Sequence, residues 1–150
     1  MAASKSRKAG RVGKSKRRGR GRKSLSLPER YEPNDQEEFM SPLQQEYFRQ
    51  KLLGWRREIL AASSQTISAL REDTMPEADI GDRASTEAGR LIELRSRDRA
   101  RKLLSKIEAA LQRIEDGTYG FCEETGEPIG VSRLEARPVA TLSLAAQERH

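Results

Sequence analysis

The chain has 150 residues, of which 35% are charged and 35% are hydrophobic types, and its formal net charge is +6. This length suffices for about one domain, and so high a charge content leaves too little apolar surface for a thick core. A large two-domain enzyme is therefore excluded, and elongated helices or disordered segments are expected.

The positive charge is concentrated at the N-terminus. Residues 1–30 hold 12 Lys or Arg and a single acid, Glu29, a net charge of +11, whereas residues 31–150 hold 17 basic and 22 acidic residues, a net charge of −5. A segment rich in Lys, Arg, Gly and Ser cannot bury enough apolar surface to fold alone, so we predict a disordered basic tail over 1–39. Such a tail can make a weak nucleic-acid contact through phosphates or act as a solubilising arm; a transit peptide ranks last.

Cysteine and histidine are too few for several kinds of site. Cys122 is the only thiol and His150 the only imidazole, which excludes an internal disulfide, a four-ligand Cys/His zinc site and a His-based catalytic triad. No apolar run approaches the roughly 18 residues of a membrane span, and no apolar stretch follows the basic N-terminus as in a secretory signal. We expect a cytoplasmic protein with no membrane association and no enzymatic activity of its own.

The first predicted helix begins after Ser41, which is followed by Pro42 at the first helical position and by Gln44 three residues after the cap. Apolar or small residues then recur at spacings of 4 and 3, the pattern of a coiled-coil seam. They are Phe48, Leu52, Trp55, Ile59, Ala62, Thr66 and Ala69. The pattern stops near Pro76, which disfavours helix in the residue before it, so a turn is expected there.

The second helix is expected to begin between Asp79 and Asp82, either of which could cap it. It is expected to end before Gly117, a glycine suited to the left-handed position at a helix terminus. Its apolar residues are Ala84, Ala88, Leu91, Leu104, Ile107, Leu111 and Ile114. The predicted fold is therefore mainly α, a long antiparallel coiled-coil hairpin over 40–117 with an acidic tip at 74–82.

A smaller module is expected at 118–150. Four glycines and alternating aromatic residues fall within 117–130, a pattern of short strands around a turn. A helical turn is expected at 132–137, and Ser143 could cap a short C-terminal helix.

Four blocks of sequence occur in a recognisable order and spacing. They are Asp-Ile-Gly-Asp-Arg-Ala at 79–84, Glu-Leu-Arg-Ser-Arg-Asp-Arg at 93–99, Tyr-Gly-Phe-Cys-Glu at 119–123 and Ile-Gly-Val-Ser-Arg-Leu-Glu-Ala-Arg-Pro at 129–138. Over about 40–148 the chain resembles the DksA/TraR family of bacterial RNA polymerase-binding regulators. The resemblance implies a transcription regulator that inserts its hairpin tip into the secondary channel of RNA polymerase. It also implies action together with guanosine tetraphosphate, as in the stringent response.

The resemblance assigns the tip of the hairpin to the neighbourhood of the polymerase active site. Asp79, Asp82 and Ala84 match the tip motif of the family. On the residues alone, both aspartates could equally be helix caps. The two interpretations predict different consequences of removing a carboxylate.

A second group matches the family's positions for guanosine tetraphosphate and for the polymerase contact. Its members are Arg99, Leu103, Lys106 and Arg137. Positions 99, 103 and 106 share a helix face, although such a basic face is most often simply solvated. Where better-studied members have a further basic residue, this chain has Gln147, so Gln147→Lys is expected to strengthen the nucleotide response.

The C-terminal module of the family is a zinc ribbon with two Cys-x-x-Cys pairs. The resemblance places Cys122, Thr125, Ser143 and Ala146 at the four ligand positions. One thiol and two hydroxyls cannot make a closed tetrahedral site, so we expect a zinc-free, degenerate zinc-finger-like module without a metal cofactor. Cys122 is expected to be a vestigial ligand and a small buried hydrophobe, since no basic neighbour is present to lower its pKa for redox chemistry.

Two other functions stay open. A Gre-like transcript-cleavage factor would use the same rod and acidic tip to hold a second magnesium ion, and a nucleic-acid-binding protein would act through its basic tail. For the favoured function, we expect a monomer whose partners are RNA polymerase and guanosine tetraphosphate.

Overall fold

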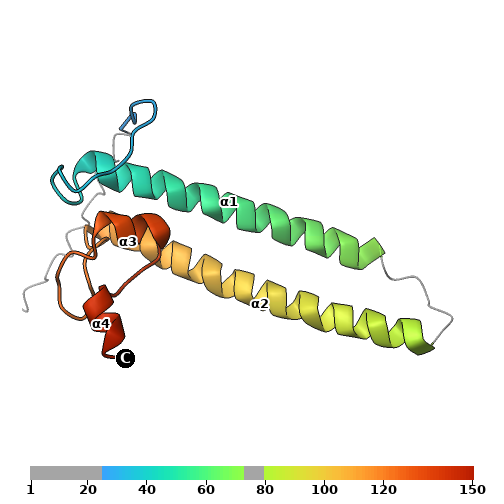
Figure 1. Cartoon of the computed structure of the whole chain (residues 1–150). Coiled ribbons are helices and arrows are strands. Elements are labelled where there is room, and N and C mark those ends of the chain that lie inside the picture. The colour runs from blue at the N-terminus through green and yellow to red at the C-terminus, as the bar shows by residue number, and fades with distance from the viewer. Residues whose placement is uncertain (1–24, 73–79) are drawn as a thin grey trace, which may run out of the picture.

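The computed structural model describes residues 25–72 and 80–150, and two long helices give this part of the chain its shape. The helices are α1 (Pro42–Glu72), α2 (Ile80–Asp116), α3 (Val131–Ala136) and α4 (Leu144–Glu148). α1 and α2 lie side by side and run in opposite directions, and α3 and α4 lie at the end where α1 begins and α2 finishes (Figure 1). The predicted mainly α hairpin with short C-terminal helices is confirmed. None of the described helices has the length and apolar character needed to span a membrane.

The start of α1 follows the capping pattern in the sequence. The Gln44 backbone N–H donates to Ser41 Oγ over 3.3 Å, and the Gln44 side-chain oxygen accepts from the Met40 N–H over 2.9 Å. Gln44 is fully buried, and its amide nitrogen donates to the Asn34 carbonyl over 3.0 Å. The cap therefore satisfies the helix terminus and also holds the preceding segment in place.

Part of the expected tail packs against the body of the protein. The Tyr31 and Tyr47 rings meet edge to face with 6.0 Å between centroids, and the Phe39 and Phe121 rings do so at 5.5 Å. Aromatic contacts of this kind bury apolar surface that composition alone does not reveal. The prediction of disorder is therefore wrong for residues 25–39, and residues 1–24 lie outside the described part of the chain.

Among the side chains that the structure describes, those buried between the two long helices lie in the half next to α3 and α4. The buried hydrophobic residues of this half are Phe48, Leu52, Ile107, Ala110 and Ile114. Trp55 and Ile59 pack against them, but farther along the rod Ala62 and Ala88 are exposed and Leu91 is 56% exposed. The predicted seam is correct from Phe48 to Ile59 and wrong at Ala62, Ala88 and Leu91. Alanines at the right spacing mark a helix face without supplying side chains that interdigitate. The side chains of Thr66 and Ala69 lie outside the described set.

The C-terminal module completes the core with little regular structure. In place of the expected short strands, the described residues contain one isolated antiparallel bridge, between Phe121 and Pro128. Tyr119 is 2% exposed, and its hydroxyl donates to the Pro138 carbonyl over 2.7 Å. This bond joins two segments of the module, and Arg113 Nη1, which donates to Glu123 Oε1 over 2.9 Å, joins the module to the end of α2.

Candidate functional site

The far end of the rod presents Asp82. This residue lies in the first turn of α2 and is exposed, as is Ala84 two residues onward. Because α2 begins at Ile80, Asp82 lies inside the helix, and the expectation that it could be the cap is wrong. A carboxylate in a first turn still stabilises its helix through the macrodipole, by about 0.3–1 kcal/mol. Asp79 lies outside the described residues.

The residues expected to bind nucleotide and polymerase separate into two places. Arg99 and Leu103 line a hollow between α1 and α2, together with Ile59. Lys106 and Arg137 line a different cavity, between α2 and the C-terminal module. Seven residues of helix separate Arg99 from Lys106 by about 10 Å along the rod, so one helix face reaches both places.

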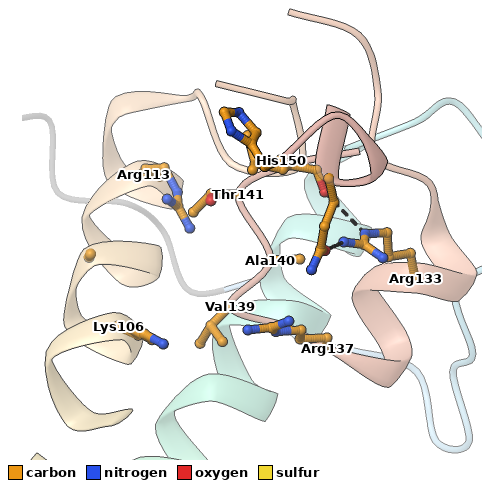
Figure 2. Close-up of a pocket in the computed structure, with 11 residues that line it drawn as sticks. Lys106, Arg113, Arg133, Arg137, Val139, Ala140, Thr141 and His150 are labelled. Carbon is orange, nitrogen blue, oxygen red and sulfur yellow. Dashed lines mark hydrogen bonds between the residues drawn. The ribbon is translucent and has the colours of Figure 1, made fainter. Parts of the chain in front are cut away.

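The cavity beside the module is strongly basic. It has a volume of about 320 Å³, and none of the described residues that line it is acidic. Its basic residues are Lys106, Arg113, Arg133, Arg137 and His150. Figure 2 shows Lys106 and Arg113 extending from α2 on one side, with Arg137 pointing toward Lys106 from the other. A concave site with several cations and an apolar floor suits a small anionic ligand.

Two of these five basic side chains already have acidic partners. Arg113 Nη1 lies 2.9 Å from Glu123 Oε1, and His150 Nε2 lies 3.1 Å from Glu124 Oε2. Within the described part of the chain, the side chains of Lys106 and Arg137 form no ion pair. The structure thus brings together two of the four expected residues and keeps their charges available.

The sequence analysis missed Arg113, Arg133 and His150 as members of this cavity. Arg133 had a usable signal, because it lies four residues before Arg137 in the same conspicuous block and residues four apart share a helix face. Arg113 had one too, because it lies seven residues after Lys106 on the same helix. His150 had none, because its place depends on how the module folds back on α2.

The four positions compared with zinc ligands do converge in the module. Cys122 is 3% exposed and Ala146 is fully buried, while Ser143 Oγ accepts the Ala146 N–H over 3.3 Å and caps α4. A hydrogen bond from the Thr125 hydroxyl, followed by one from the Ser143 backbone, lowers the pKa of the Cys122 thiol to about 6. The expected burial of Cys122 is confirmed. No basic neighbour is among the causes, but hydrogen-bond donors, which the sequence analysis did not consider, stabilise the thiolate as a basic neighbour would.

The lowered pKa of Cys122 predicts that stability depends on pH. A thiol in an unfolded chain has a pKa of roughly 8.5, so the contribution of the thiolate is fully present above that pH and is lost as the pH falls through about 6. Melting temperatures measured at several pH values should therefore fall more steeply toward pH 6 in the natural protein than in Cys122→Ala. Parallel curves for the two proteins would contradict the assignment.

Comparison with known proteins shows the family. Residues 44–114 match the family described as DnaK suppressor protein DksA, N-terminal domain, and residues 117–150 match the prokaryotic dksA/traR C4-type zinc finger. The chain belongs to the DksA/TraR family. The resemblance inferred from the four sequence blocks is therefore confirmed.

Similar proteins agree with this family over most of the chain. A Caulobacter vibrioides protein named RNA polymerase-binding transcription factor DksA is 61% identical over 120 residues, covering 80% of this chain and 84% of the relative. The Escherichia coli K12 protein of the same name is 38% identical over 133 residues, covering 84% and 88%. The solved structure of transcription factor DksA2 from Pseudomonas aeruginosa aligns with a TM-score of 0.69 at 45% identity, covering 74% of this chain and 85% of that one.

The DksA/TraR zinc-finger match and the side chains at the ligand positions disagree about zinc. Cys122 is the single cysteine, Ser143 Oγ is occupied as a helix cap, and Ala146 contributes a methyl group. Across 25–72 and 80–150, no three His, Cys, Asp or Glu residues are grouped as metal ligands. These residues do not fit a four-cysteine zinc site.

Proposed function

We propose that this protein is a non-enzymatic transcription regulator that binds RNA polymerase in the cytoplasm and inserts its hairpin tip into the secondary channel. It modulates promoter complexes together with guanosine tetraphosphate, as in the stringent response. The names of the Caulobacter and Escherichia relatives support polymerase as the partner. The observation that carries the proposal is the exposed Asp82 at the far end of a two-helix rod, about 50 Å along α2 from the module.

The shape suits a tip that enters a channel while the base stays outside. The distal half of the rod is narrow, since it consists of two helices with no further element packed on them (Figure 1). A carboxylate delivered to a site that contains a metal ion and basic side chains changes the local electrostatics without covalent chemistry. This action requires no nucleophile and no general base on the regulator.

Co-purification with RNA polymerase and promoter-specific transcription tests the proposal. The tail is best removed as residues 1–24, because residues 25–39 pack on α1 through Tyr31 and on the module through Phe39. The shortened protein should keep polymerase binding and promoter regulation. Loss of regulation together with DNA binding would favour the tail-led alternative. Transcript cleavage in stalled elongation complexes would favour the Gre-like one.

We further propose that the C-terminal module folds without zinc. Elemental analysis should find no stoichiometric zinc, and the melting temperature should be the same with and without a chelator, because no metal-linked folding energy is present. The control is a variant with Thr125→Cys, Ser143→Cys and Ala146→Cys, which should bind zinc and become sensitive to the chelator. One zinc ion per natural chain would contradict the proposal.

The basic cavity predicts a selective effect of Lys106→Ala. Loss of one charge-assisted contact should weaken the response to guanosine tetraphosphate about ten-fold and leave the nucleotide-independent effect of the tip intact. Lys102→Ala is the matched control, because Lys102 lies on the same helix, pairs with Asp98 over 3.0 Å and does not line the cavity. Equal titrations for the two variants would show that Lys106 is a solvated surface residue.

A further inference from the structure

The guanidinium of Arg133 is held in a fixed orientation at the rim of the basic cavity. Its Nε donates to the Leu142 carbonyl over 3.1 Å, and its Nη2 donates to the Gln147 side-chain oxygen over 2.5 Å. A guanidinium has five N–H donors, so three remain for another partner. Both acceptors are neutral, and in the described part of the chain no carboxylate is paired with Arg133, so its positive charge is not cancelled.

The charge around the cavity indicates the class of ligand. After the pairing of Arg113 with Glu123 and of His150 with Glu124, three basic side chains are left without acidic partners among the described residues. They are Lys106, Arg133 and Arg137. Three cations around about 320 Å³, with no Asp or Glu side chain among the described lining residues, match a ligand with several negative charges close together, as in a phosphorylated nucleotide.

We propose that Arg133, oriented by Gln147, is a phosphate-binding residue of this cavity, and that the ligand is the guanosine polyphosphate of the proposed function, on which this inference rests. The prior orientation of the guanidinium reduces the conformational entropy lost when a phosphate binds. Gln147 is then a positioning residue. Its neutral amide oxygen accepts from Arg133 and leaves the charge of Arg133 free for the ligand.

This assignment changes the expectation for position 147. On the sequence, Gln147 looks like a lost phosphate contact that lysine would restore. In the structure, a lysine there would bring an ammonium group against the Arg133 guanidinium and remove its acceptor. Two like charges at hydrogen-bond distance repel, so the gain of one cation is offset by displacement of the other.

A purely structural role for Arg133 is the competing explanation, because its two bonds join α3 to the segment around α4. The variant Gln147→Glu separates the two roles. A glutamate keeps the acceptor for Arg133 and adds an ion pair, so a structural link between α3 and α4 is maintained or strengthened. The same change neutralises the charge that would bind phosphate, so a phosphate-binding role is weakened.

The test uses the full chain with RNA polymerase and measures promoter inhibition over a titration of guanosine tetraphosphate, with polymerase affinity and melting temperature recorded for each variant. Arg133→Gln and Gln147→Glu should each weaken the nucleotide response about ten-fold, the latter without loss of thermal stability. Gln147→Lys alone should give no gain. Gln147→Lys in the Arg133→Gln background should restore most of the response, because a cation returns to the same place.

Two results would overturn the inference while leaving polymerase binding intact. The first is that the midpoint of the guanosine tetraphosphate titration is unchanged in both Arg133→Gln and Gln147→Glu, which would show that Arg133 has a structural role only. The second is a ten-fold stronger nucleotide response from Gln147→Lys alone, which would show that Gln147 is a lost phosphate contact and does not position Arg133. Failure of the natural protein to bind polymerase would instead refute the proposed function, and this inference with it.

Discussion

Replacing Gly120 by alanine is expected to destabilise the protein strongly. Gly120 has φ +89°, and a Cβ there would lie 2.9 Å from Met40 Cγ, 3.0 Å from Met40 Sδ and 3.2 Å from Phe39 Cζ. The left-handed backbone and the overpacking together cost about 2–4 kcal/mol of unfolding free energy. Met40 is 7% exposed, so its side chain has little room to move away. Urea denaturation followed by circular dichroism measures the loss.

Gly126→Ala is the matched control for this prediction. Gly126 also has a positive φ, +73°, but an added Cβ meets nothing within 4 Å. Its cost should be limited to backbone strain, about 1–2 kcal/mol. Combining Gly120→Ala with Met40→Ala should recover part of the loss, because the colliding side chain is gone and the two sites are coupled. Equal costs for Gly120→Ala and Gly126→Ala would show that the segment before α1 does not pack on the module.

Asp82→Asn is expected to abolish most of the effect on regulated promoters, by ten-fold or more in the concentration required, while polymerase affinity stays close to that of the natural protein. The swap preserves size and removes the charge. Since Asp82 lies in the first turn of α2, it also removes a helix-dipole interaction of about 0.3–1 kcal/mol, too little to unfold a helix of 37 residues.

Glu87→Gln provides the control for Asp82→Asn. Glu87 is also exposed on α2, farther from the helix start, so the same change of charge there should leave promoter regulation unaltered. Helicity measured by circular dichroism should be equal in the two variants. If promoter regulation survives Asp82→Asn, the carboxylate has a structural role only. The proposal that the tip acts through this carboxylate is then wrong.

The sequence by itself determined the elements whose causes are local. Ser41 with Gln44 predicted a helix start, and α1 begins at Pro42; Gly117 predicted a helix end, and α2 ends at Asp116 with Gly117 at φ +78°. Caps and left-handed glycines act over a few residues, so they can be recognised without knowing what packs nearby. The family also followed from the sequence, because its characteristic blocks are contiguous.

The tertiary structure decided what depends on contacts between segments distant in the chain. Three such features depend on the folded module. They are the packing of Phe39 against Phe121, the hydrogen bond from Arg133 to Gln147, and the lowered pKa of Cys122 through Thr125 and Ser143. Composition predicts that Phe39 belongs to a disordered tail. The lowered pKa of Cys122 is not expected from the sequence, because no basic residue is its neighbour there. The physical reason is the same in each case: burial, hydrogen bonding and charge compensation are set by neighbours in space, whereas a helical spacing or a run of charge reports only neighbours in sequence.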